Sequence, residues 1–155
     1  MSFDPAKHVF KPGDGEHLHW GGPAAGKVTI MIDPVNSGPT GFCVLTQSLD
    51  PGSVVPVHHH EKAEQVLFII SGRGQVSLED HQVEAGPGVT VHVPKGVAHG
   101  IANTGDEPLY ILEITSPPGF QEIFRKMHEL SEPDAEDIAR IGAEYDIAVH
   151  PGEGS

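Results

Sequence analysis

One stretch of the chain reads Gly52-Ser53-Val54-Val55-Pro56-Val57-His58-His59-His60-Glu61-Lys62-Ala63-Glu64-Gln65 and holds three histidines, two glutamates and a glutamine. Side chains on a strand alternate between its two faces, so a strand here places His58 and His60 on one face and His59 on the other. Two imidazoles on one inward face form half of a metal site. We therefore expect the surrounding chain to build a container around this stretch.

Length and composition indicate one all-β domain. The chain has 155 residues, which is the length of a single domain. It contains 19 glycines and 14 prolines, yet 37% of its residues are hydrophobic, so many turns separate short strands in a chain that can still bury a core. The clearest predicted strands are 27–35, 41–49, 65–71, 75–79, 89–93 and 109–114.

The pattern divides the chain into an N-terminal arm (1–26), a β-barrel (27–116), a helical segment (117–150) and a loose tail (151–155). Apolar residues recur at helical spacing after Pro118 and predict helices over 120–130 and 133–145. Ser131 is the expected N-cap of the second helix. Both helices are expected to pack on the outside of the barrel.

The charge balance bears on the partners of the protein. Its formal net charge is −13, from 22 acidic and 9 basic residues. Such a charge repels phosphate backbones and anionic lipid surfaces, so we expect neither nucleic acid nor membrane as a partner. Strand 65–71 is apolar on both faces, which favours a homodimer or a second layer covering its outer face.

Cysteine usage and the first residues favour a reducing compartment. Cys43 is the only cysteine, so no disulfide can form within the chain. The first eight residues contain no apolar run, and no stretch approaches the length of a membrane span. We expect a cytoplasmic protein.

Two motifs carry a resemblance to a known family. The first is Gly52-(x5)-His58-x-His60-(x4)-Gln65-(x6)-Gly72, and the second is Gly88-(x5)-Pro94-x-Gly96-(x2)-His99-(x3)-Asn103. Together they resemble the two motifs of the cupin superfamily, with glutamine where a glutamate is usual. The short gap between them is similar to that of small single-domain cupins. The segment Pro117-Pro118-Gly119-Phe120 is also similar to cupins grouped with quercetin 2,3-dioxygenase-like proteins.

The resemblance implies a cupin-type double-stranded β-helix, or jelly-roll barrel, with a metal site inside. By the motifs, His58, His60, Gln65 and His99 would hold one divalent metal ion, with His99 coming from the far sheet. Iron is the first candidate, and manganese, nickel, zinc and copper suit the same ligands. Strand alternation lets only one of Glu64 and Gln65 face the metal, and counting back from Gly72 favours Gln65.

The expected function is that of a metal-dependent enzyme acting on a small, oxygen-rich organic molecule, with a dioxygenase as the first form. Glu64, if it lies free near the metal, is a candidate general base. A neutral Gln65 ligand instead favours a non-redox Lewis-acid enzyme such as a lyase, an isomerase or a polyketide-cyclase-like protein. A non-catalytic binding or sensor protein remains a third hypothesis.

Other polar residues are secondary candidates. His17 and His19 form either a second metal pair or part of a polar arm across the barrel mouth, and the arm is favoured because no third ligand follows. His92, Tyr110 and Glu113 lie on predicted strands, where each has equal chances of lining the cavity and of facing outward.

Overall fold

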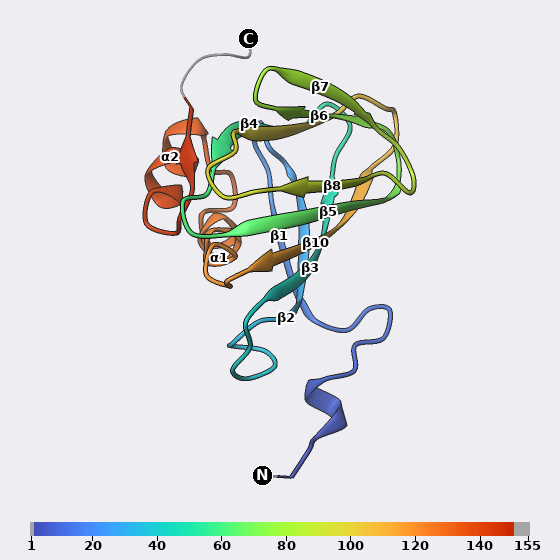
Figure 1. Cartoon of the computed structure of the whole chain (residues 1–155), viewed down its shortest axis with the longest axis vertical. Helices are drawn as coiled ribbons and strands as arrows, with labels where there is room; N and C mark the ends of the chain where they lie inside the picture. The colour runs from blue at the N-terminus through green and yellow to red at the C-terminus, as the bar shows by residue number, and fades with distance from the viewer. Residues whose placement is uncertain (1, 151–155) are drawn as a thin grey trace.

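A computed structural model of the chain describes residues 2–150, so the tail predicted at 151–155 lies outside the described part. The two sheets of the barrel face each other (Figure 1). Sheet A has the strand order β1 (Glu16–Trp20), β2 (Gly26–Ile32), β3 (Cys43–Leu49), β10 (Leu109–Ser116), β5 (Glu64–Ser71) and β8 (Thr90–Val93). Sheet B has the order β11 (Ala148–Val149), β4 (Val54–His59), β9 (His99–Asn103), β6 (Gly74–Leu78) and β7 (His81–Ala85). A short 3-10 helix, η1 (Pro5–Lys7), precedes them.

Alternation along the strands sends apolar side chains into two adjoining cores. One core lies between β5, β8 and β10 of sheet A and β6 and β9 of sheet B, and includes Ile69, Val76 and Ile111. The other lies between β1 to β3 and the C-terminal helices, and includes Trp20, Ile30 and Phe124. The all-β double-sheet fold predicted from the sequence is confirmed.

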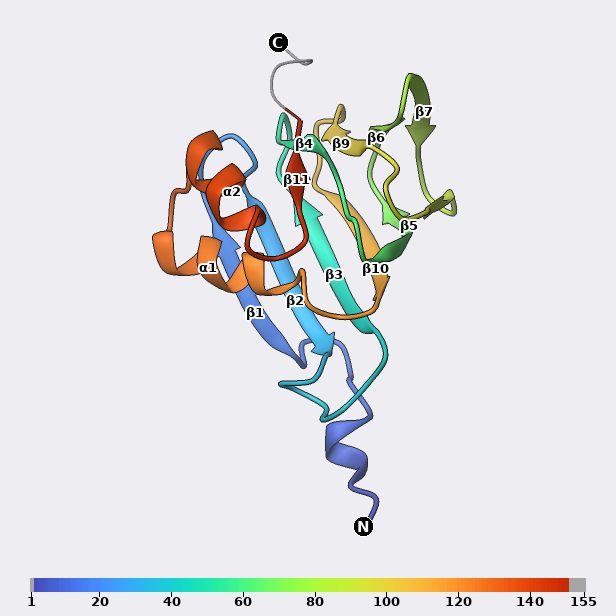
Figure 2. The same cartoon turned by 60° about the vertical axis from the view of Figure 1, so that its left-hand side comes forward.

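The two C-terminal helices are α1 (Glu122–Leu130) and α2 (Ala135–Gly142). They lie beside sheet B, outside the sandwich of the two sheets, and cover the β1 and β2 end of sheet A (Figure 2). Both helices are shorter than predicted. No helix among residues 2–150 is long and apolar enough to cross a membrane.

The N-cap of α2 is Asp134, not Ser131. The Asp134 carboxylate accepts a hydrogen bond from the Asp137 backbone N–H at 2.8 Å, and the Asp137 side chain accepts one from the Asp134 N–H in return. Ser131 instead ends α1 in a left-handed conformation with φ 70°. The capping pair satisfies two of the N–H groups that a helix start leaves free, and this explains why the helix begins later than its apolar pattern suggested.

The predicted arm contributes to the sheet. Residues Glu16–Trp20 form strand β1, which pairs antiparallel with β2 from Glu16 opposite Ile30 to Trp20 opposite Gly26. The apolar side chains of Leu18 and Trp20 are buried, which explains why this Gly- and Pro-rich segment is ordered as a strand.

A largely buried cluster of ion pairs connects α1 to β1 and to the end of β2. The carboxylate of Asp33 has no exposed surface and lies 3.0 Å from the Arg125 guanidinium, which also contacts Glu16 at 2.6 Å and Glu122. The hydrogen bond from Arg125 lowers the pKa of Glu16. Because removal of one partner leaves a buried charge uncompensated, Arg125 is required for the stability of this corner.

Replacing Arg125 with alanine should therefore destabilise the fold by about 3 kcal/mol, lowering the melting temperature by roughly 6–12 °C. Arg140→Ala is the matched control, because Arg140 pairs with Asp137 on the exposed surface of α2 and should cost under about 1 kcal/mol. Thermal unfolding followed by circular dichroism compares the two. Equal shifts for both variants would contradict the proposed role of the cluster.

Candidate metal site

The three motif histidines meet on sheet B. His58 on β4 lies directly opposite His99 on the adjacent strand β9, and His60 follows the end of β4. One ring nitrogen from each lies within 4.8 Å of the others. The expectation that His99 comes from the far sheet was wrong. Strands β4 and β9, which carry His58 and His99, are neighbours in sheet B, and Gln65 lies on the opposite sheet because the chain crosses to sheet A at the 61–63 turn. His59 points away and contacts His150 and Glu61.

Backbone carbonyls hold all three rings in one tautomer. Nδ1 of His58 lies 2.7 Å from the Pro56 carbonyl, and Nδ1 of His99 lies 3.0 Å from the Val97 carbonyl. Nδ1 of His60 lies 2.7 Å from the carbonyl of Asp146. A carbonyl only accepts, so each Nδ1 carries the proton and donates it. Each Nε2 is left with a free lone pair, as metal-binding histidines require.

Burial keeps these rings neutral. Removal from water lowers the pKa of His99 to about 4 and lowers that of His60. Burial, together with the neighbouring His99 and His60, holds the pKa of His58 well below its usual value. At neutral pH the cluster is therefore in the unprotonated form that binds a cation.

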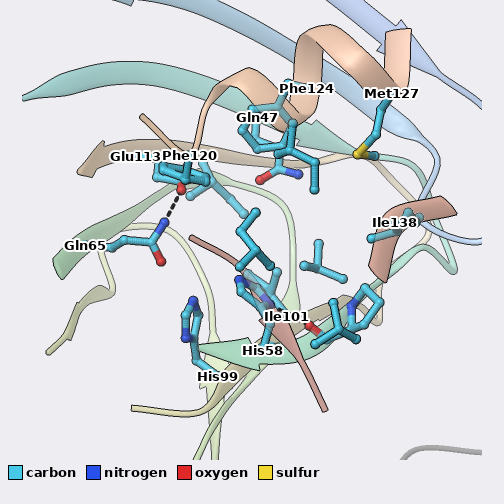
Figure 3. Close-up of a pocket in the computed structure, with 18 of the residues that line it drawn as sticks. Gln47, His58, Gln65, His99, Ile101, Glu113, Phe120, Phe124, Met127 and Ile138 are labelled. Atoms are coloured by element: carbon cyan, nitrogen blue, oxygen red, sulfur yellow. Dashed lines mark hydrogen bonds between the residues drawn. The ribbon is translucent and has the colours of Figure 1, made fainter. Parts of the chain in front are cut away.

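Sheet A contributes two polar side chains that face the histidines. Gln65 on β5 is 3% exposed, and its amide nitrogen donates to the Glu113 carboxylate on β10 at 2.5 Å. In Figure 3 the amide oxygen of Gln65 points toward His58 and His99, while its nitrogen points toward Glu113. Burial raises the pKa of Glu113 to about 7. The site thus contains a neutral amide next to the histidines and a carboxyl group behind it.

Among residues 2–150, two buried side-chain atoms lack a hydrogen-bond partner, and both belong to this cluster. They are Nε2 of His60 and Oε1 of Gln65. An unpaired buried acceptor costs free energy, and a cation bound by both atoms removes that cost. The residues present therefore fit a divalent metal ion with His58, His60, His99 and Gln65 as ligands. Three imidazoles and an amide oxygen suit iron, manganese, nickel, copper or zinc.

Other candidate residues lie outside this cluster. Glu64 points to the outer face of β5, where its carboxylate contacts His92 at 3.0 Å and both side chains are more than half exposed. Tyr110 is also on the outer face. His17 is bound to Thr29 and to the Gly13 carbonyl, far along β1 from the cluster. Within residues 2–150, His58, His60 and His99 are the one group of three that converges on a common point.

His58, His99, Gln65 and Glu113 form the polar end of a cavity of about 80 Å³. Beyond Gln47, the rest of the lining is mainly apolar and comes from both sheets, from α1 and α2, and from the C-terminal residues; it includes Trp20, Leu67, Ile101, Ile111, Phe120, Phe124, Met127, Ile138, Ile147 and Val149. A ligand here meets polar groups at one end and hydrocarbon elsewhere (Figure 3).

Comparison with known proteins identifies the family. A family model described as a cupin domain matches residues 45–115, which include both sequence motifs and every residue of the cluster. Residues 45–115 form a cupin domain. A solved structure, that of the polyketide cyclase RemF from Streptomyces resistomycificus, shares the fold with a TM-score of 0.61 and 22% identity, over 71% of this chain and 79% of that one.

Curated relatives of this chain have varied names. An uncharacterized protein of Methanocaldococcus jannaschii is 35% identical over 48% of this chain and 60% of its own length. A glucose-6-phosphate isomerase of Thermococcus onnurineus is 38% identical over 37% of this chain and 34% of its own. A 5-aminosalicylate 1,2-dioxygenase of Comamonas sp. is 33% identical over 63% of this chain and 26% of its own. The chain thus spans less than two thirds of these relatives.

Sequence reasoning left Glu113 as one of three strand residues with equal chances of facing inward. Its strand, β10, alternates strictly, with Leu109, Ile111, Glu113 and Thr115 buried. Leu109, Ile111 and Thr115 alternate with exposed positions, and this two-residue spacing could have predicted from the sequence that Glu113 faces inward.

Metal binding should depend on the three histidines and not on the exposed ones. His99→Ala is expected to weaken binding of Zn²⁺ or Co²⁺ by more than about 100-fold, since loss of a ligand exceeds the effect of losing an outer hydrogen-bond partner. His92→Ala, on the outer face, should keep native affinity. Titration of chelator-treated protein with elemental analysis measures both. Full binding by His99→Ala would refute the assignment.

Proposed function

We propose that this cupin is a divalent-metal-dependent enzyme for a small, largely apolar organic molecule with one oxygen-bearing group, and that Glu113 transfers a proton during the reaction. The observation that carries the proposal is the position of Glu113. Its buried carboxyl lines the polar end of the cavity, hydrogen-bonded to Gln65, which in turn faces the three histidines.

The ligand set determines what the site does to a substrate. Three neutral imidazoles and an amide add no negative charge, so a bound divalent ion acts as a strong Lewis acid toward a carbonyl, enolate or phenolate oxygen. Iron is the ion expected first from the sequence, and zinc and manganese suit the non-redox chemistry equally. His58, His60 and His99 would hold the ion, and their carbonyl partners keep the rings in place.

Glu113 and Gln65 act as a pair in this scheme. The Gln65 amide N–H donates to the Glu113 carboxylate and so holds it toward the cavity. A carboxyl in this position can take a proton from the carbon next to a carbonyl and return it elsewhere, which is general acid–base catalysis. The apolar lining excludes water and accepts the hydrocarbon part of the substrate.

These features favour non-redox chemistry, such as that of a lyase, an isomerase or a cyclase, because the carboxyl serves proton transfer and is free of the metal. An iron-dependent dioxygenase is the second candidate function. The similarity to the Comamonas dioxygenase over 63% of this chain favours it. Both functions begin with the binding of an enolisable oxygen, so oxygen dependence separates them.

A homodimer in the cytoplasm is also proposed, as the sequence suggested. Supporting the dimer, four large apolar side chains on the outer face of the neighbouring strands β5 and β10 are 38–40% exposed: Phe68, Ile70, Tyr110 and Ile114. A second copy of the chain that packs this face against its own would cover them.

The activity test uses β-diketones and hydroxyacetophenones with protein loaded separately with iron, zinc and manganese. We expect turnover under argon with zinc or manganese, followed by NMR of substrate and product. Consumption of O₂ with iron only would select the dioxygenase. No turnover and no oxygen uptake, with metal bound, would refute the proposal and favour a binding or sensor protein.

The role of Glu113 is tested by two isosteric variants. Glu113→Gln should keep metal stoichiometry and lower kcat by about 10²–10⁴-fold, the usual contribution of a proton-transferring group. Glu64→Gln changes the neighbouring exposed carboxylate, which points outward to His92. A larger loss in Glu64→Gln than in Glu113→Gln would instead support the general base first suggested by the sequence.

The dimer is tested by charging its proposed interface. Phe68→Lys combined with Ile114→Lys places like charges on both copies, so the protein should sediment as a monomer while keeping its circular dichroism spectrum. Lys replacement of the exposed Val35, which lies in the loop after β2, is the control and should leave the native mass unchanged. A native protein that sediments as a monomer would contradict the proposal.

A further inference from the structure

His60 depends on a distant part of the chain for its orientation, unlike the other two histidines. His58 and His99 each donate to a carbonyl two residues earlier, on β4 for His58 and in the loop before β9 for His99. His60 donates to Asp146, which lies 86 residues further along the chain. Its ring also packs edge-on against Phe120, with ring centroids 5.0 Å apart. Both partners of His60 therefore lie in the C-terminal segment.

Asp146 contacts the same part of β4 in a second way. Its carboxylate accepts hydrogen bonds from three consecutive backbone N–H groups of the turn after His60: Glu61 at 2.9 Å, Lys62 at 3.1 Å and Ala63 at 3.1 Å. Three aligned N–H groups form an anion-binding concavity, and here a side chain of the protein occupies it. The turn that follows His60 is thus held by the same residue that orients its ring.

The backbone of Asp146 is shaped for both contacts. Its φ is 63°, in the left-handed region that aspartate enters more readily than most residues. This conformation turns the carbonyl and the carboxylate toward the end of β4 together. The residues that follow form β11 and continue along the metal-bearing strand, with Ala148 opposite His59 and Val149 opposite His58. Asp146 is therefore fixed on both sides.

We propose that Asp146 is a positioning residue for the metal site: its carbonyl sets the tautomer and orientation of His60, and its carboxylate holds the 61–63 turn so that Nε2 of His60 meets the other ligands. This inference rests on the proposed metal site. Asp146 lies beyond residues 45–115, the part that the cupin model matches, so the device belongs to the C-terminal segment of this chain. Docking of that segment completes the site.

The test separates the carboxylate from the backbone. Asp146→Gly accepts the positive φ without strain and keeps the carbonyl, but removes the three hydrogen bonds to the turn. Affinity for Co²⁺ and Zn²⁺ should fall about 10-fold to 100-fold, as is typical when the partner of a metal ligand is lost. The visible spectrum of bound Co²⁺ should change as well, because the His60 ring moves. Asp146→Asn retains an acceptor oxygen and should lose less.

Glu144→Ala is the matched control, since it removes one carboxylate from the same segment at an exposed position. It should bind metal like the native protein. All titrations are made below the melting temperature of each variant, so that loss of folding is not read as loss of affinity. If Asp146→Gly does not fold, Asp146→Asn decides. Affinities within about twofold of the native value would overturn the proposal.

A second readout does not depend on metal. In metal-free native protein, ¹⁵N NMR of the His60 ring should show a single tautomer with the proton on Nδ1. In Asp146→Gly, which keeps the carbonyl, the proton should stay on Nδ1, but the His60 ring signals should shift because the 61–63 turn is no longer held, while those of His58 and His99 stay unchanged because their partners are local. If the native protein binds no metal, the proposed function fails, and this measurement still decides the role of Asp146. A mixed tautomer in the native protein would overturn it.

Discussion

The placement of polar groups between two apolar sheets is the constraint on which the site depends, because every buried donor or acceptor needs a partner. Backbone carbonyls satisfy Nδ1 of the three histidines, and Glu113 satisfies the Gln65 amide nitrogen. Within the described residues, the buried side-chain atoms that remain unpaired are Nε2 of His60 and Oε1 of Gln65. The buried side-chain atoms without a hydrogen-bond partner thus lie at the place where a cation would be bound.

The charge of the donor set follows from one position. With glutamine at 65, the four candidate ligands are neutral, and the buried carboxyl of Glu113 lies behind the amide. A carboxylate ligand would neutralise part of the charge of a divalent ion, whereas in the proposed site that charge would remain to stabilise an anionic oxygen of a substrate. The carboxyl that does not bind the ion is left available for proton transfer.

The C-terminal segment contacts both the cavity and the histidine cluster. Its helices and the residues Ile147 and Val149 line the apolar part of the cavity, and the carbonyl of Asp146 accepts a hydrogen bond from His60 of the histidine cluster. One short stretch of chain therefore contacts both the cavity and the candidate metal site.

The sequence by itself determined the all-β fold, the two motifs and the division of His58, His59 and His60 between two faces, because strand alternation and turn residues are local properties. Counting from Gly72 also favoured Gln65 over Glu64 for the inner face, which is where Gln65 lies. Only the tertiary structure showed that His99 pairs with His58 on one sheet, that Glu113 lies behind Gln65, and that Asp146 reaches His60. These contacts are between residues far apart in the chain. They depend on strand order and packing, which no local sequence pattern predicts.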